Sequence, residues 1–374
     1  MSELLVATGE ALVRVASSEP EMLLERPGLH AVAVDPRRPE RIAVGCRGAG
    51  VWESNNRGAS WRDADLPAED VFSVAFSPAD GAVYAGCEPS ALYVRRNDGR
   101  WEELAALREL PSAPTWSFPP RPWTSHVRWI APSPYDAGLI LVGIELGGLM
   151  RTTDGGETWA DHRPGAQPDV HALAWHPTEL GRAYEAAGGG AAWSRDGGES
   201  WELAGKGMHA AYMPPEKRES PNIQDPHRIA CCAAKPEAMW AQHHNGIFRS
   251  IDAGRTWRSI NDAFGFAVAV HPRNAETAWF VPAIKDELRY PAEGKFAVTR
   301  TRDGGKSFET LREGLPQEHA YDLVYRHGLD VDEGGEQLAI GSTTGGLWLS
   351  MNGGDSWRCL AARLPPIYCL RFAK

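Results

Sequence analysis

Short runs of apolar and β-branched residues recur along the whole chain, and each one ends at a turn residue. Residues 31–34 form such a run before Asp35 and Pro36, and residues 267–270 form another before His271 and Pro272. A second apolar run follows each of these turns. Runs of this length that are bounded by turn residues are typical of β-strands. The pattern therefore predicts an all-β protein built from short strands.

A second repeat follows each pair of apolar runs. Its consensus is [ST]-x-[DN]-x-G-x-[ST]-[WF], and its good copies span residues 54–61, 152–159, 194–201, 250–257, 301–308 and 350–357, with a shortened copy at 96–101. Asp or Asn followed by Gly suits a tight hairpin turn, because the side chain bonds nearby backbone and Gly accepts positive φ. The Asp-x-Asp spacing of calcium loops is absent. We interpret each copy as a structural turn between two strands.

Together the two patterns predict a repeating unit of strand A, turn, strand B, loop, strand C, repeat turn and strand D. A four-stranded unit repeated along a chain is a propeller blade. The sequence contains seven internal units, and its ends supply the parts of one more. Residues 4–9, 11–16 and 22–25 match strands B, C and D, and residues 366–374 match strand A. We predict one domain over 1–374 with eight blades, the closing blade being shared by both termini. A seven-bladed ring is the alternative.

The repeat resembles the Asp-box, or BNR, repeat of sialidase-like β-propellers, and the resemblance covers nearly the whole chain. It implies a scaffold that sialidases and other glycoside hydrolases share with sortilin-like receptors and with assembly factors of photosynthetic complexes. Sialidases of this type carry an Arg-Ile-Pro segment near the N-terminus. The nearest string here is His-Arg-Ile-Ala230, in the middle of the chain. No sialidase residue is therefore assigned, and sialidase activity is not expected.

Charge and composition limit the kinds of partner that we expect the protein to bind. The chain has 39 Lys+Arg against 49 Asp+Glu, a formal net charge of −10, which argues against a nucleic-acid partner. No apolar run approaches the roughly 18 residues of a membrane-spanning helix, so no membrane partner is expected. The six cysteines are scattered and form no metal-binding pair, and the N-terminus lacks the features of a signal peptide. We expect free thiols, a cytoplasmic location and a monomer.

Strand order decides where a site can form. In a blade the A–B and C–D turns lie on one face, whereas the B–C and D–A connections lie on the other. The repeat turns occupy the first face. The longest irregular segments, at 104–128, 206–228 and 282–295, are D–A or B–C connections. Because functional residues concentrate on long loops over a rigid scaffold, we expect the site on this second face.

The second face collects residues that can perform acid–base chemistry and hold an anion. The candidate catalytic residues are His126, His227, His243, His244 and Glu145, and the candidate substrate-binding residues are Arg121, Arg128, Arg228, Trp123, Tyr212 and Asp225. Histidine titrates near neutral pH, and arginine pairs with carboxylate or phosphate. Glu145 and Glu185 are candidates for the carboxyl pair that sugar hydrolysis requires.

No metal is assigned from the sequence, and the cofactor is unknown. A metal held by His227, His243, His244 and a carboxylate is an open alternative, although no compact ligand motif supports it. The resulting hypothesis is a hydrolase or lyase that acts on a small polar or anionic substrate, with a saccharide as one candidate. The alternative is a non-catalytic propeller that uses the same face to hold a ligand or a protein partner.

Overall fold

The computed structural model describes residues 2–16, 19–97 and 99–373, and over this range the protein is an all-β, eight-bladed β-propeller. The described strands form eight sheets, seven of them four-stranded. The prediction of eight blades is confirmed, and the seven-bladed alternative is wrong. Asp98 of the shortened repeat and Lys374, which the sequence assigns to the last strand, lie outside the described residues.

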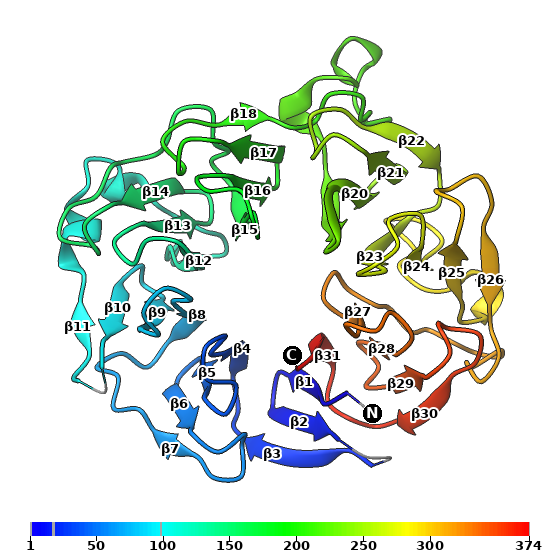
Figure 1. Cartoon of the computed structure of the whole chain (residues 1–374), viewed down its shortest axis with the longest axis horizontal. Helices are drawn as coiled ribbons and strands as arrows, with labels where there is room; N and C mark the ends of the chain where they lie inside the picture. Colours follow the sequence, from blue (N-terminus) through cyan, green and yellow to red (C-terminus); the bar gives the residue numbers. More distant parts are fainter. Residues whose placement is uncertain (1, 17–18, 98, 374) are drawn as a thin grey trace. The chain divides into compact units, whose positions relative to one another are not determined.

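Residues 23–204 form one compact unit with four successive blades (Figure 1). The first two are β4 (Leu29–Val34), β5 (Ile42–Cys46), β6 (Gly50–Ser54) and β7 (Arg62–Asp63), then β8 (Val71–Phe76), β9 (Val83–Cys87), β10 (Leu92–Arg95) and β11 (Glu102–Glu103). The next two are β12 (Val127–Pro132), β13 (Ile140–Ile144) and β14 (Gly148–Thr152), then β15 (Val170–Trp175), β16 (Ala183–Ala187), β17 (Gly190–Ser194) and β18 (Glu202–Leu203). Each blade follows chain order, with antiparallel neighbours.

The second compact unit joins the first 22 residues to the chain from Gly205 onward. Its three internal blades are β19 (Pro226–Cys232), β20 (Lys235–His243), β21 (Gly246–Ser250) and β22 (Arg258–Asn261); β23 (Gly265–Val270), β24 (Ala278–Pro282), β25 (Val298–Thr301) and β26 (Glu309–Leu311); and β27 (Leu329–Val331), β28 (Leu338–Gly341), β29 (Leu347–Ser350) and β30 (Arg358–Ala361).

Both termini build the closing blade, as the sequence predicts. Its sheet has the order β3 (Glu21–Glu25), β2 (Ala11–Val15), β1 (Leu4–Thr8) and β31 (Ile367–Phe372). Val6 of β1 pairs with Leu370 of β31 in an antiparallel ladder. This pairing joins the two terminal segments in one sheet, so the facing edges of β1 and β31 are both hydrogen-bonded.

The third internal blade departs from the prediction because it lacks a full strand D. Only a single bridge, between Arg151 and Ala160, follows the repeat turn there. The imidazole of His162 accepts the backbone N–H of Leu149 at 3.1 Å, and Asp161 accepts the backbone N–H of Ser112 at 3.0 Å. A side chain therefore takes one backbone hydrogen bond of β14, while the carbonyl oxygen of Leu149 accepts the backbone N–H of Arg163 at 3.0 Å.

The repeat turns connect strands C and D, and side-chain hydrogen bonds hold each turn in shape. In the copy at 194–201, Ser194 donates to Asp196 at 2.8 Å, and its oxygen accepts the N–H of Gly198 at 2.9 Å. The Asp196 carboxylate accepts the N–H of Ser200 at 3.0 Å. All six good copies repeat these three contacts. The structural interpretation of the repeat is confirmed.

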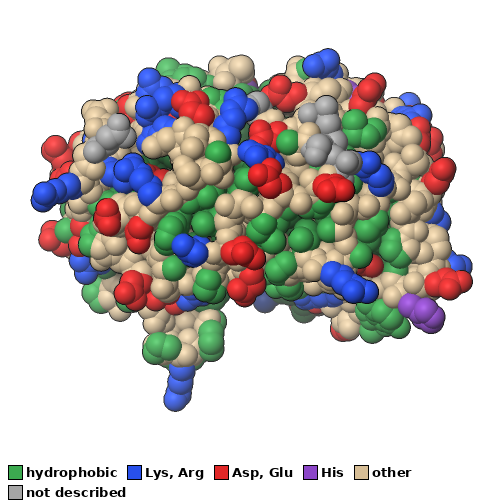
Figure 2. Space-filling model, turned by 90° about the horizontal axis from the view of Figure 1, so that it is seen from below, with side chains coloured by type: hydrophobic (Ala, Val, Ile, Leu, Met, Phe, Trp, Pro, Cys, Tyr) green, Lys and Arg blue, Asp and Glu red, His purple; other side chains and the backbone are tan. Residues whose placement is uncertain are grey.

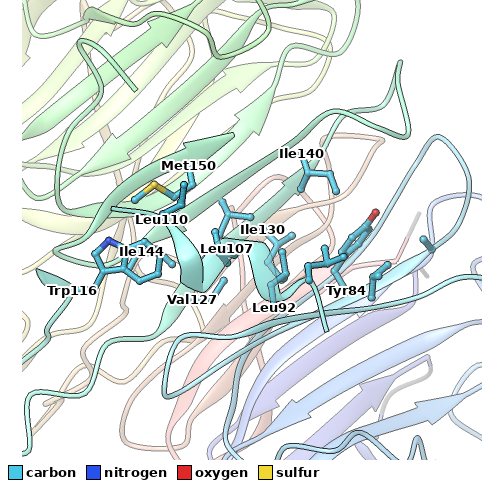
Figure 3. Close-up of a cluster of buried hydrophobic side chains, with 14 residues drawn as sticks. Tyr84, Leu92, Leu107, Leu110, Trp116, Val127, Ile130, Ile140, Ile144 and Met150 are labelled. Carbon is cyan, nitrogen blue, oxygen red and sulfur yellow. The ribbon is translucent and has the colours of Figure 1, made fainter. Parts of the chain in front are cut away.

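The aromatic residue that ends the repeat at 194–201 packs between neighbouring blades. Trp201 lies in the apolar cluster that joins the blades of β12–β14 and β15–β18, and its indole N–H donates to Gly198 at 3.1 Å. A second cluster, which includes Tyr84, Leu92, Val127 and Ile140, joins the preceding pair of blades (Figure 3). Each unit is therefore held by apolar seams between successive blades.

The remaining described structure is irregular, apart from five short 3₁₀ turns. No helix in the described part of the chain is long and apolar enough to cross a membrane. Figure 2 shows acidic and basic side chains mixed over the visible face.

Candidate functional site

A β-bulge near the start of strand A recurs in seven blades. In β4, for example, Leu29 pairs with Cys46 and Ala31 with Gly45, so His30 is an extra residue in the ladder. The corresponding extra residues in the other six blades are Phe72, Arg128, His171, His227, Phe266 and Tyr368. A bulge turns one side chain away from the regular alternation of a strand. In these seven blades, strand A therefore presents one aromatic or basic side chain next to the B–C and D–A connections.

His126 is the buried centre of a first cluster, which we name the His126 cluster (His126, Glu145, Glu88, Arg47, Arg128 and Phe72). The His126 side chain is 1% exposed, and its Nε2 lies 2.6 Å from Oε2 of Glu145. Because a carboxylate only accepts, Nε2–H donates in this hydrogen bond. The other ring nitrogen lies 3.4 Å from Oε2 of Glu88. Two carboxylates thus flank one buried imidazole.

Two arginines border the same cluster. Arg47 pairs with Glu88 at 2.5 Å, and its guanidinium lies 5.4 Å from the ring centre of Phe72. The guanidinium of Arg128 lies 5.6 Å from the same ring, and its Nε is 3.8 Å from Oε2 of Glu145. That Nε is buried and has no hydrogen-bond partner among the described residues. Arg128 therefore has bonding capacity left beside Glu145.

The second oxygen of Glu145 faces a further histidine. Oε1 lies 3.8 Å from Nε2 of His171, which is 3.4 Å from Oδ2 of Asp169. Glu145 is 8% exposed as a residue, whereas the side chain of His171 is 28% exposed. The carboxyl of Glu145 thus lies between a buried histidine and a more accessible one.

A second cluster, the His227 cluster (Asp225, His227, His244, His243 and Phe266), lies where β19 begins and β20 ends. Oδ2 of Asp225 is 3.5 Å from Nε2 of His227 and 3.4 Å from Nδ1 of His244. Burial raises the pKa of Asp225, but the neighbouring imidazoles, His227 first and then His244 and His243, outweigh this effect. The net effect is a lowered pKa, so the carboxylate form of Asp225 is favoured.

The surroundings fix both inner histidines of this cluster. Nδ1 of His227 lies 2.6 Å from the carbonyl oxygen of Gly265, and its ring stacks on Phe266 with centroids 4.4 Å apart. Nε2 of His243 accepts the backbone N–H of Asp225 at 3.0 Å. Burial lowers the pKa of His243 to about 3, against the opposing effect of Asp225. His243 is therefore a neutral support for the backbone at Asp225.

The other predicted substrate-binding residues are dispersed. Arg121 and Trp123 are exposed on the connection after β11, with Trp123 at a positive φ of 66°. The hydroxyl of Tyr212 donates to the carbonyl oxygen of Ile223 at 2.8 Å, and its ring lies 4.9 Å from that of His244. Tyr212 thus borders the His227 cluster.

Arg228 has a different environment from the other arginines. Its guanidinium donates to the carbonyl oxygens of Arg326 and Leu329, the latter at 3.0 Å. Removal from water lowers the pKa of Arg228, and the charge of Arg371 adds to the effect. These bonds occupy one nitrogen of Arg228 with the backbone of its own unit.

Glu185 lies within β16, and its carboxyl contacts the backbone of a neighbouring loop. Its Oε2 accepts the N–H of Gln167 at 3.0 Å, while Oε1 is buried and has no partner in the described part of the chain. Burial raises the pKa of Glu185 to about 8. Glu145, in contrast, is bonded to His126.

Sequence reasoning missed several residues that contact these clusters: His30, Phe72, His171, Asp169 and Phe266. A usable signal exists, because Phe72 and His171 occupy the same second position of strand A as the candidates Arg128 and His227. Alignment of the strand A segments alone would have identified this position. The bulge that makes the position special is not visible in the apolar pattern.

Two sets of side chains have the composition and proximity to hold a metal ion. One is Asp225, His227 and His244, and the other is Glu145, Asp169 and His171; within each set the donor atoms lie within 4.8 Å of one another. In the second set, one oxygen of Glu145 is already bonded to His126. Both sets lie at the ends of strands A and B.

The fold and these clusters define a β-propeller with polar sites at the loop ends of its strands. No family model matches the sequence, and the search of curated proteins also finds no match. Solved structures that match include a Niastella koreensis GH74 enzyme (15% identity, TM-score 0.45), an ancestral GH74 enzyme (16%, 0.52) and YCF48 bound to D1 peptide (15%, 0.53).

The lengths of the matched structures differ. The matches cover 96%, 93% and 94% of this chain, respectively, but 61%, 37% and 96% of the three matched chains. The chain therefore spans about two thirds or less of the two GH74 enzymes. At these identities the ancestral GH74 enzyme and YCF48 establish the propeller fold alone.

Proposed function

We propose that the protein is a hydrolase or lyase that acts on a small polar or anionic substrate, with Glu145 as its acid–base residue. The observation that supports this proposal is the 2.6 Å hydrogen bond between buried His126 and Glu145. A buried hydrogen bond holds a carboxyl group in one orientation. His126 is a positioning residue here, because it is too buried to touch a substrate.

Arg128 supplies the binding element of this proposal. Its guanidinium lies beside Glu145, and its buried Nε lacks a partner among the described residues. Guanidinium groups bind carboxylate or phosphate through paired hydrogen bonds. An anionic group on Arg128 would place the reacting bond of a small substrate near Glu145. His171, on the other side of Glu145, is a second group able to transfer protons.

The fold alone does not decide between enzyme and binding protein, because the similar structures include a GH74 enzyme and a peptide-bound YCF48. We infer that the repeat turns are Asp boxes, since six of them share one hydrogen-bond pattern. We also infer that residues 1–374 work as one domain in the cytoplasm, which accords with the free thiols of the six cysteines. Sialidase activity is not part of the proposal.

The test is a turnover screen with a matched pair of variants. Purified protein is incubated with chromogenic esters and with neutral and anionic aryl glycosides. Loss of a general acid–base group reduces turnover by roughly 10²–10⁴-fold. We expect Glu145→Gln to show such a loss, whereas Glu10→Gln, an exposed control, retains wild-type turnover.

The runner-up is a non-catalytic propeller that holds a ligand or a protein partner. Exposed Trp123 and Tyr212, on two of the long connections, are the observation in its favour. Calorimetric binding of a screened compound without turnover, unchanged in Glu145→Gln, would support this function and reject the enzyme. Equal turnover by wild type and Glu145→Gln would also reject the role of Glu145.

A further inference from the structure

We propose that Asp225, His227 and His244 form a binding site for a divalent transition-metal ion of the Zn²⁺ type. The three donor atoms lie within 4.8 Å of one another. Two imidazole nitrogens and one carboxylate oxygen are a donor set that zinc and similar ions accept. The site belongs to a different blade and a different unit from Glu145, so it stands independently of the proposed function.

The hydrogen bond between His227 and Gly265 determines which ring nitrogen of His227 can bind a metal ion. Its Nδ1 lies 2.6 Å from the carbonyl oxygen of Gly265, which can only accept, so Nδ1 carries a hydrogen. Nε2 is therefore the ring nitrogen that faces Asp225, 3.5 Å from Oδ2 of its carboxylate. A metal ion binds histidine through a ring nitrogen that carries no hydrogen, so Nε2 is the nitrogen of His227 available as a ligand. Metal-bound histidines commonly hold their other nitrogen by such a bond to a carbonyl group.

The distances between the donor atoms of Asp225, His227 and His244 also fit a metal site. Asp225 Oδ2 is 3.5 Å from the nitrogen of His227 and 3.4 Å from that of His244. These separations exceed the usual 2.7–3.2 Å of an N–H···O hydrogen bond. Two ligands that are each about 2.1 Å from a tetrahedral zinc ion lie roughly 3.4 Å apart. The spacing of the donors therefore fits shared coordination better than direct hydrogen bonds.

The fold holds the three donors in place before any ion binds. Asp225 directly precedes β19, and His227 is the second residue of this strand and the extra residue of its bulge. His244 follows directly after β20, the strand paired with β19. The ring of His227 stacks on Phe266, and His243 accepts the N–H of Asp225. Preorganised donors of this kind favour tight binding.

The other candidate set, around Glu145, is less suited to a metal. One oxygen of Glu145 is engaged by His126 at 2.6 Å, and the other is 3.8 Å from His171. The His227 cluster also supplies three ligands, which leaves one position of a tetrahedral ion for water or a small anion. Its ligand is therefore a divalent ion that retains an exchangeable position.

Metal binding tests the proposal directly. Untagged protein with Cys231→Ser and Cys359→Ser, which removes the two exposed thiols, is stripped with a chelator. It is then titrated with Zn²⁺ by calorimetry and with Co²⁺ by visible absorption. We expect one equivalent of Zn²⁺ and a Co²⁺ spectrum without thiolate bands. Asp225→Asn, His227→Gln and His244→Asn should each weaken binding at least about tenfold, since changes even outside the ligands cost about 10–100-fold.

A matched histidine outside the cluster provides the control. His319 is exposed, and its positive φ of 52° suits asparagine, so His319→Asn should bind Zn²⁺ like the parent. His244 is only half-buried, so His244→Asn tests the site even where His227→Gln perturbs folding. The proposal is overturned if the parent binds less than one equivalent, or if His244→Asn and His319→Asn bind Zn²⁺ with equal affinity.

Discussion

The imidazole of His126 lies flat on the ring of Phe72, with centroids 3.7 Å apart and planes 13° from parallel. Phe72 is the bulged residue of its strand, and Arg47 and Arg128 lie over the same ring. An aromatic pair of this kind contributes about 0.5–1.5 kcal/mol beyond the area that it buries. Phe72 is therefore the apolar support on which His126 rests.

The first prediction is that Phe72→Leu destabilises the protein through His126. We expect the free energy of unfolding to fall by about 1.5 kcal/mol, measured by urea denaturation, because stacking is lost and leucine fills less space. Phe118 meets the same imidazole edge-on, with centroids 4.8 Å apart. In a His126→Leu background the effect of Phe72→Leu should shrink. An unchanged effect there would show that Phe72 does not act through His126.

The second prediction concerns pH and Glu185. Burial raises the pKa of this carboxyl from 4.5 to about 8. The folded protein therefore binds one more proton than the unfolded chain between these two values, so its stability falls as pH rises through this range. At pH 7 the resulting decrease in the free energy of unfolding, relative to pH below 4.5, is on the order of 3 kcal/mol. Glu185→Gln should remove this component and raise stability at pH 7–8.

Denaturation curves between pH 5 and 8 measure this component. The control is Glu202→Gln, at an exposed position of β18, which should keep the wild-type slope of stability against pH. If Glu185→Gln retains the wild-type slope, Glu185 is ionised in the folded protein at neutral pH.

The third prediction separates backbone strain from crowding in a repeat turn. Gly198 and Gly48 both have positive φ, 83° and 76°. A Cβ at Gly198 would lie 2.5 Å from Leu141, whereas one at Gly48 would meet nothing within 4 Å. Gly48→Ala should cost about 1 kcal/mol from backbone strain. Gly198→Ala should cost about 3 kcal/mol because overpacking adds to the strain. Equal losses in thermal unfolding would refute a packing role for Gly198.

The fourth prediction contrasts two arginines that the sequence placed in one class. Arg228→Ala removes the donor from the carbonyl groups of Arg326 and Leu329, so we expect a loss of about 2–3 kcal/mol. Arg121→Ala changes an exposed side chain and should stay within about 0.5 kcal/mol. Both values come from urea denaturation. A loss for Arg228→Ala as small as that for Arg121→Ala would show that its contacts to the backbone contribute little.

The blades could be predicted because their signals are local. The geometry of a turn such as 194–201 follows from hydrogen bonds among its own residues Ser194, Asp196 and Gly198. The apolar runs on either side of it predict strands. The closing blade also followed, because the first and last segments complete the repeat. The missing strand in the third internal blade was not predictable, since its repeat turn at 152–159 has the same residue pattern and the same hydrogen bonds as the other copies.

The arrangement of the candidate residues could be predicted only in part. That D–A and B–C connections meet follows from strand order, which brings His126 close to Glu145 and Asp225 close to His244. The bulges determine which side chains face one another, and the residue types at these positions do not predict a bulge. For the same reason Arg128 and Arg228 look alike in the sequence, although Arg228 is bonded to backbone carbonyl groups.

The repeated bulge has a consequence for how such a protein can change. An extra residue in a ladder has no partner residue of its own, so replacing its side chain leaves the paired residues on either side in register. His30, Phe72, Arg128, His171, His227, Phe266 and Tyr368 could thus each vary without altering a strand pairing. The scaffold separates the residues that maintain the blades from those that decide what is recognised, which makes these seven positions the natural choice for a combinatorial library.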